Sequence, residues 1–201
     1  MAASELAAVE IHGLDRGSFL MKSVLAVGTV YGVAAVGPFV GRALAESGDL
    51  GILNFALTLE YLEADFYKKG MKLNLRSEVA QFAKLAGEHE QQHVDALIAT
   101  VKKLGGTPVK KPTFKFPISD EASFLKLAQT LEDTGVGAYN GAAPAIESKE
   151  VLAAAGSIVQ IEARHAAVIR LLNSATPAPA AFDEALMKGK VLAAVKPLIK
   201  A

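Results

Sequence analysis

The feature that most constrains this chain is an internal repeat built from glutamate and histidine. Two Glu-x-x-His motifs occur, at residues 90–93 and 162–165. A further glutamate precedes each motif by 30 residues, Glu60 in the first case and Glu132 in the second, and each ends a Thr-Leu-Glu triplet. A repeat of this kind predicts a duplicated helical hairpin, with two similar halves related by an approximate twofold axis.

The apolar residues from Gly51 onward recur at helical spacing, and alternation of β-branched residues is scarce. The pattern therefore predicts an all-α fold. Gly, Pro and Ser clusters interrupt it. We predict helices over residues 50–69, 77–104, 120–141 and 149–173, and a short C-terminal helix over residues 183–199.

The chain divides by composition into three parts. Residues 1–45 are an apolar N-terminal segment, residues 46–174 contain the four long helices, and residues 175–201 begin with a Pro/Ala-rich link. The connection at residues 105–119 contains three prolines. A 27-residue helix is about 40 Å long, and fifteen residues in polyproline-like extension reach about 46 Å. We therefore expect a long crossover between helices two and three, although a simple up-down bundle is also compatible with the pattern.

The N-terminal segment resembles an export signal. Residues 24–40 form an uncharged run after Arg16 and Lys22, and Ala43-Leu44-Ala45 supplies a small-x-small pattern for signal peptidase. The start of the segment resembles a twin-arginine signal but has Gly17 where the second arginine belongs. An uncleaved membrane anchor and an apolar assembly helix are the alternatives. We expect an exported (periplasmic, cell-surface or extracellular) or a membrane-anchored protein.

The composition excludes several classes of site. Cysteine is absent, so disulfides, thiolate metal sites and cysteine nucleophiles are excluded. The formal net charge is zero, tryptophan is absent and no long basic block occurs, so nothing supports a nucleic-acid partner. Any metal ion must be held by oxygen and imidazole ligands.

The repeated motif has the chemistry of a metal site. Residues three apart on a helix share one face, so a Glu-x-x-His pair can bind one ion together. Glutamate fills 14 of 201 positions, so any one histidine has about a 7% chance of Glu three residues before it. Four carboxylates also neutralise two divalent cations while both histidines stay neutral. Without cations, we expect burial and mutual repulsion to raise the pKa of all four glutamates. Solvated glutamates and histidines on helix surfaces are the alternative.

The order Glu, Glu-x-x-His, Glu, Glu-x-x-His over four helices resembles the ferritin-like superfamily of di-metal carboxylate proteins. Residues 50–199, including the C-terminal tail, are similar to the desiccation-related ferritin-like proteins of bacteria, fungi and plants. The resemblance implies a ferritin-like four-helix bundle with an apolar N-terminal helix and a short C-terminal helix. Cage-forming ferritins lack a complete second Glu-x-x-His, which argues against iron storage in a shell. The implied ligands of two Fe or two Mn ions are Glu60, Glu90, His93, Glu132, Glu162 and His165.

Two functions are compatible with these ligands. The first is a di-iron or di-manganese oxidoreductase of ferroxidase, peroxidase or catalase type, which reacts with dioxygen or peroxide in stress protection. The second is a non-catalytic structural or assembly protein outside the cytoplasm, stapled by its ions. A metal-free helical interaction module is a third and weaker hypothesis. The apolar N-terminal segment is compatible with a membrane partner and with a homo-oligomer.

Some further polar residues are weaker candidates. Glu63 follows Glu60 by one helical turn and is either a spare ligand or a surface residue, with Gly135 at the equivalent place in the second half. Tyr67 and Tyr139 each lie seven residues beyond a repeat glutamate. Because two turns span about 10 Å, we expect them to pack in the core with the hydroxyl reaching water, the alternatives being a redox role or hydrogen bonds to the ligands.

Three other residues flank the motifs. His89 points about 100° away from the adjacent ligand and is predicted to lie on the surface. Asp95 and Arg164 are candidates for orienting the ligands. The predicted core faces of the first and fourth helices are formed by Phe55, Leu59, Leu62, Phe66, Val159, Ile161, Val168 and Ile169.

Overall fold

The computed structural model describes residues 48–200, which fold into helices. No strand occurs among these residues, and one isolated bridge joins Phe114 to Ile199. The all-α prediction is confirmed, and the four long helices begin and end within two residues of their predicted limits. The helices are α3 (Gly48–Gly70), α4 (Ser77–Lys103), α5 (Glu121–Ala142), η2 (Ala143–Ala145), α6 (Lys149–Leu172), α7 (Lys188–Val195) and η3 (Lys196–Leu198).

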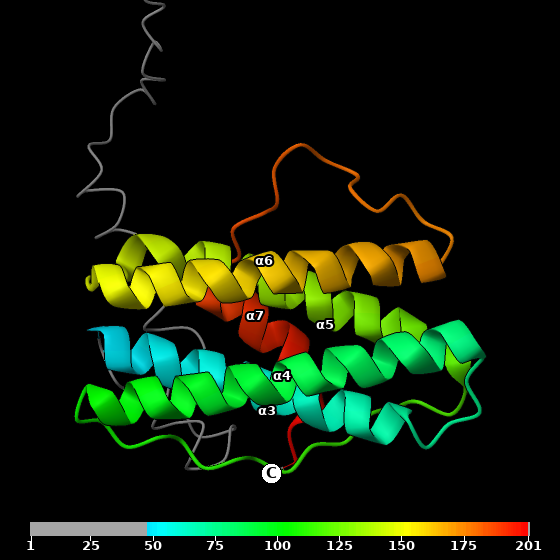
Figure 1. Ribbon diagram of the computed structural model, residues 1–201, viewed down its shortest axis with the longest axis horizontal. Coiled ribbons are helices and arrows are strands. Elements are labelled where there is room, and N and C mark those ends of the chain that lie inside the picture. The colour runs from blue at the N-terminus through cyan, green and yellow to red at the C-terminus, as the bar shows by residue number, and fades with distance from the viewer. Residues whose placement is uncertain (1–47, 201) are drawn as a thin grey trace, which may run out of the picture. The chain divides into compact units, whose positions relative to one another are not determined.

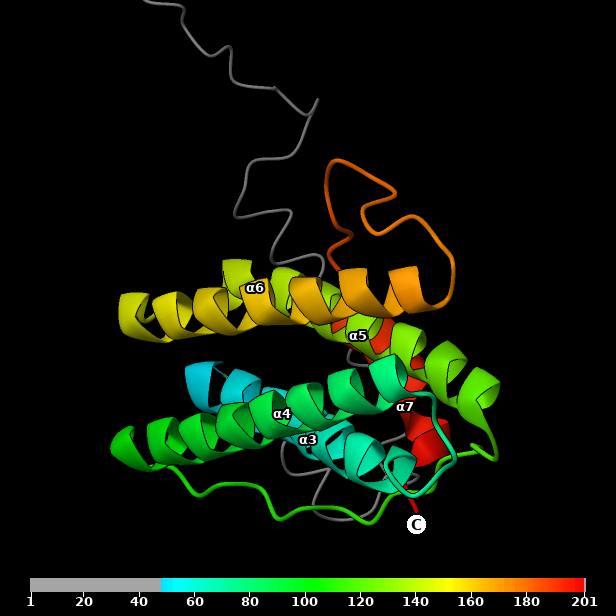
Figure 2. The same cartoon turned by 45° about the vertical axis from the view of Figure 1, so that its right-hand side comes forward.

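The long helices form two antiparallel hairpins that pack as two layers. The helices α3 and α4 make one layer and α5 and α6 make the other, as Figures 1 and 2 both show. Each hairpin contains one copy of the sequence repeat. Both helices of the second hairpin begin at a capping side chain. At the start of α5 the Asp120 side chain accepts from the Ser123 amide at 2.8 Å, and Ser148 caps α6.

The connection at residues 105–119 crosses the length of α3 (Figure 1). Near its start, the Val109 amide donates to Asn54 Oδ1 at 2.8 Å, close to the beginning of α3. Near its end, Lys69 Nζ donates to the carbonyl of Phe114 at 2.9 Å, at the end of α3. The helices α4 and α5 therefore run in the same direction, and the predicted long crossover is confirmed.

Two apolar clusters fill the bundle on either side of its middle. One contains Phe66 and Phe124, whose rings stack with centroids 5.0 Å apart, and the other contains Leu57 and Val101. The predicted core face of α3 is buried throughout. On α6, Ile169 is fully buried, Val159 and Ile161 are half-buried, and the prediction for Val168 is wrong because its side chain is exposed.

The C-terminal helix is shorter than predicted, since residues 183–187 are not helical. The Leu186 amide donates to the carbonyl of Gly137 at 2.8 Å, and Leu186 packs on Gly137 and Gly141. A side chain at either glycine would collide with Leu186. This contact with α5 replaces the helical hydrogen bonds that periodicity predicted for the segment.

The predicted N-terminal helix lies outside the described residues, so its structure stays a prediction. Within residues 48–200, none of the helices is both long and apolar enough to span a membrane.

Candidate metal centre

The six residues of the repeated motif meet in the middle of the bundle. Each long helix contributes, because α3 and α5 carry the single glutamates and α4 and α6 carry the Glu-x-x-His motifs. All six side chains are buried, and the four glutamates are 0% exposed. The structure thus brings together Glu60, Glu90, His93, Glu132, Glu162 and His165.

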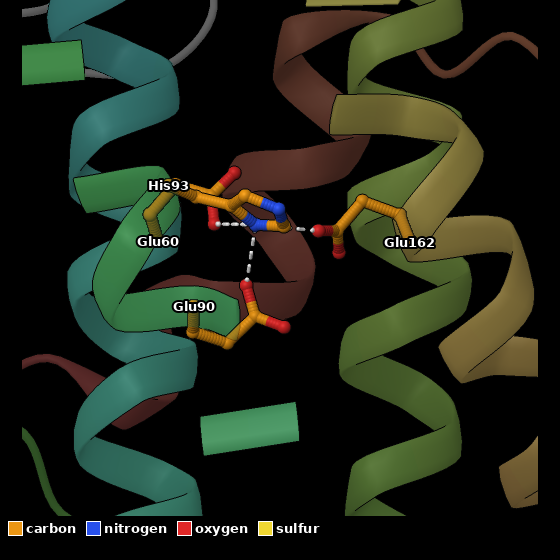
Figure 3. A group of neighbouring side chains, drawn as sticks. All are labelled: Glu60, Glu90, His93 and Glu162. Carbon is orange, nitrogen blue, oxygen red and sulfur yellow. Dashed lines mark hydrogen bonds and ion pairs between the residues drawn. The ribbon is translucent and has the colours of Figure 1, made fainter. Parts of the chain in front are cut away.

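The first half of the cluster surrounds the ring of His93 (Figure 3). Its Nδ1 lies 3.3 Å from Glu60 Oε2 and 3.0 Å from Glu90 Oε2. The same nitrogen lies 3.1 Å from Glu162 Oε1, which comes from the opposite hairpin. One imidazole nitrogen therefore faces three carboxylates.

The second half surrounds His165 in a similar way. Its Nδ1 lies 2.9 Å from Glu90 Oε1 and 3.5 Å from Glu132 Oε2. Glu90 therefore directs one oxygen toward each histidine, so that this carboxylate is placed between the two halves.

The donor atoms form two overlapping sets of four. One set is Glu60, Glu90, His93 and Glu162, the other is Glu90, Glu132, Glu162 and His165, and within each set the atoms lie within 4.8 Å of one another. Two ligand atoms bound to one transition-metal ion at about 2.0–2.2 Å lie at most about 4.4 Å apart, which is close to the spread of each set. Glu90 and Glu162 belong to both sets, which is the position of bridging carboxylates.

A buried carboxylate oxygen without a hydrogen-bond partner also fits a cation site. Glu162 Oε2 is buried and has no hydrogen-bond or ion-pair partner among residues 48–200. A buried carboxylate oxygen without a partner is costly. Carboxylate and imidazole donors suit iron and manganese. The cluster is therefore compatible with a di-metal site.

Burial sets the protonation of most carboxylates in the metal-free centre. It raises the pKa of Glu60 to about 8, although the hydrogen bond from His93 opposes the shift. Burial also raises the pKa of Glu132, and raises that of Glu162 well above its ordinary value. These three directions agree with the expectation from the sequence.

Glu90 is the exception, and the prediction for it is wrong. Burial alone would raise its pKa, but the hydrogen bonds from His165 and His93 outweigh burial and lower the pKa to about 2. Burial disfavours charge on the histidines as well, yet carboxylate partners raise the pKa of His93 to about 12 and that of His165 to about 10. The metal-free centre therefore holds protons on both imidazoles.

Two tyrosines connect the halves crosswise. The hydroxyl of Tyr139 on α5 donates to Glu60 Oε1 at 2.5 Å, and that of Tyr67 on α3 donates to Glu132 Oε1. Both rings are buried, so the prediction that the hydroxyls reach water is wrong. Helical side chains lean toward the N-terminus of their helix, which returns each ring to the level of the opposite glutamate.

His89 is not a surface residue, contrary to the prediction. Its ring is half-buried and stacks on His165, with centroids 5.2 Å apart, and its Nδ1 lies 3.0 Å from His165 Nε2. Burial, then the neighbouring His165, lowers the pKa of His89. Ile161 occupies the equivalent place 72 positions later, so this contact exists in one half only.

The remaining candidates from the sequence differ in their exposure to solvent. Asp95 is exposed and accepts from Gln91 at 3.0 Å, and Arg164 is exposed, so neither orients a ligand. Glu63 is buried and 4% exposed, which excludes the surface alternative.

The arrangement defines a class: a helical bundle of ferritin-like architecture with a buried carboxylate–histidine cluster between two hairpins. The sequence model of the family described as "Ferritin-like domain" matches residues 48–175. The chain belongs to this ferritin-like domain family.

Seven solved chains resemble the structure significantly. One is a conserved hypothetical protein, rv2844, from Mycobacterium tuberculosis, with 22% sequence identity and a TM-score of 0.57. The match covers 65% of this chain and 94% of that chain. At this identity the likeness concerns the fold alone. No curated protein matches the chain significantly.

Proposed function

We propose that this protein binds two iron or two manganese ions and uses them in redox chemistry with dioxygen or peroxide. Glu60 and His93 would hold one ion, Glu132 and His165 would hold the other, and Glu90 and Glu162 would be shared between the two positions. The observation that carries the proposal is the pair of overlapping four-ligand sets, which share both Glu-x-x-His glutamates.

Charge supports a pair of ions. The four carboxylates of the repeated motif balance two divalent cations, and metal-bound histidines are neutral ligands, so these six residues with two divalent ions would have no net charge. A single divalent ion would leave two buried negative charges without compensation. Pairs of Fe(II) or Mn(II) supply electrons to dioxygen or peroxide when bound.

The surrounding residues hold the ligands in place. The Tyr139 hydroxyl donates to one oxygen of Glu60, and the Tyr67 hydroxyl donates to one oxygen of Glu132. The second oxygen of each glutamate is left directed at the cluster. When Nδ1 of His165 is a ligand, its Nε2–H can donate to neutral His89 and fix the ring.

An apolar cavity lies in the half of the bundle next to Tyr139. Its volume is about 50 Å³, and its lining includes Leu59, Ala138 and Tyr139. None of the six proposed ligands lines the cavity, but Tyr139, whose hydroxyl donates to Glu60, separates the two. A small apolar molecule such as dioxygen suits this space.

The resemblance to desiccation-related proteins and the apolar residues 24–40 support a proposal for the physiological role. We propose protection against oxidative or drying stress outside the cytoplasm, with residues 1–45 as export signal or anchor, residues 46–174 as the metal-binding bundle, and residues 175–201 as a C-terminal extension.

Stopped-flow absorbance tests the redox proposal directly. Protein loaded anaerobically with Fe(II) is mixed with dioxygen or hydrogen peroxide, and its oxidation is compared with free Fe(II) at the same pH. We expect the wild type to react at least about tenfold faster and Glu132→Ala to lose this advantage. Exposed Glu88→Gln is the matched control on α4. Equal rates in wild type, Glu132→Ala and buffer would leave only a structural role for the ions.

A further inference from the structure

Glu63 is a fifth buried carboxylate beside the centre. It lies on α3 one turn beyond Glu60 and is 4% exposed. No hydrogen bond or ion pair to Glu63 occurs among residues 48–200. Buried charged groups are normally paired or bound to metal, so a cation is a suitable partner for this carboxylate.

The opposite half provides space for Glu63 because it lacks the same side chain. Gly135 on α5 is equivalent to Glu63, 72 positions later. A Cβ at Gly135 would lie 3.3 Å from Glu63 Oε1 and 3.1 Å from Glu162 Oε2. The glycine therefore lets two carboxylate oxygens approach the same point. A small cavity of about 10 Å³ is bordered by Glu63, Thr134 and Gly135.

The orientation of Glu162 shows which ion position Glu63 adjoins. Its Oε1 lies 3.1 Å from His93, in the first half. Its Oε2, which has no partner, lies on the Gly135 side and is available to the second half, formed with Glu132 and His165. Glu63 Oε1 lies next to the same glycine, so Glu63 approaches the second half.

We infer that Glu63 is a seventh protein ligand, which binds the ion held by Glu132 and His165. The inference rests on the proposed di-metal function. Glu63 lies outside both four-atom sets, so it would have to turn toward the ion to bind it. Five carboxylates balance one divalent and one trivalent cation, so Glu63 stabilises the more oxidised pair and makes the two positions unequal.

The test compares Glu63→Gln, which keeps the side-chain volume and removes the charge, with exposed Glu88→Gln. Stepwise Fe(II) titration measures each affinity, ⁵⁷Fe Mössbauer spectra report each iron, and a redox titration gives the potential. We expect Glu63→Gln to bind one of two ions about tenfold more weakly. Its spectrum should change at one iron and its reduction potential should rise, whereas Glu88→Gln should match the wild type.

The outcomes separate this inference from the proposed function. A wild type that binds no iron would refute both. A wild type that binds two ions, together with a Glu63→Gln variant of unchanged affinities, spectrum and potential, would overturn the role of Glu63 alone. If Glu63→Gln does not fold, two equivalent irons in the wild-type spectrum would still overturn the inference.

Discussion

The crosswise tyrosines make each half of the centre depend on the other hairpin. Tyr139→Phe removes the donor to Glu60, and Tyr67→Phe removes the donor to Glu132. Loss of such an outer hydrogen bond typically weakens metal binding by about 10–100-fold. We expect each variant to weaken one ion of the pair, measured by stepwise Mn(II) titration calorimetry. Half-buried Tyr61→Phe is the control. Wild-type affinities in both buried-tyrosine variants would contradict this role.

The protonation of the ligands predicts how metal stabilisation depends on pH. Folded-state pKa values of about 8 for Glu60, 12 for His93 and 10 for His165 all exceed the ordinary values. The metal-free folded chain therefore binds more protons than the unfolded chain, and its stability falls as pH rises. For Glu60 this contribution is complete below about pH 4.5 and is lost by about pH 8; for the histidines it is complete below about pH 6.5.

Bound metal displaces these protons, so metal-loaded protein should not show this loss. We expect the stabilisation by metal to grow from pH 5.5 to 8, by roughly 1.4 kcal/mol per pH unit for each proton released. The low pKa of Glu90 adds no slope in this range, because Glu90 is ionised throughout. Thermal melts with metal and with chelator measure the difference. A flat or shrinking difference would contradict a shared buried site.

The sequence was sufficient to predict the six clustered residues, because i,i+3 spacing and a common interval are local and countable. It was insufficient for the residues that support them. Tyr67 contacts Glu132 and His89 contacts His165, and both contacts depend on helix packing. Glu90 was assigned the wrong pKa direction because its position between two histidines is a tertiary property.

The C-terminal segment is held on α5 by glycines. A Cβ at Gly141 would lie 2.0 Å from the carbonyl oxygen of Leu186, which is backbone and cannot rotate away. We expect Gly141→Ala to destabilise the protein by about 1–3 kcal/mol. Gly156→Ala on α6 is the control, because no atom lies within 4 Å of the added Cβ. It should stabilise by about 0.5–1 kcal/mol. Denaturant unfolding measures both, and equal effects would show that residue 141 does not hold the segment.

Helical periodicity predicted the long helices closely because each has its own apolar face. It failed at residues 183–187, where the amphipathic pattern continues but the Leu186 amide pairs with Gly137. That hydrogen bond joins positions far apart in the chain, and periodicity carries no information about it. The proline-rich crossover was predictable from its length, since fifteen extended residues can match a long helix.

At the scale of the whole molecule, we propose that the N-terminal segment sets the compartment in which the protein works. The uncharged residues 24–40 and the Ala43-Leu44-Ala45 site lead us to expect export or membrane attachment. Cell fractionation combined with intact-mass measurement tests this. We expect either a processed exported chain or a full-length membrane-bound one. A full-length, freely soluble cytosolic species would contradict both and favour an assembly role for the segment.

Two transition-metal ions per chain are the central claim, and elemental analysis with protein quantification tests it most directly. After reconstitution with Fe(II) or Mn(II) and removal of free metal, the wild type should contain about two ions. The Glu90→Ala/His93→Ala variant should lose most of them, because it removes a proposed bridging glutamate and one proposed histidine ligand. Glu88→Gln should keep both. A wild-type content near zero with both metals would contradict the account.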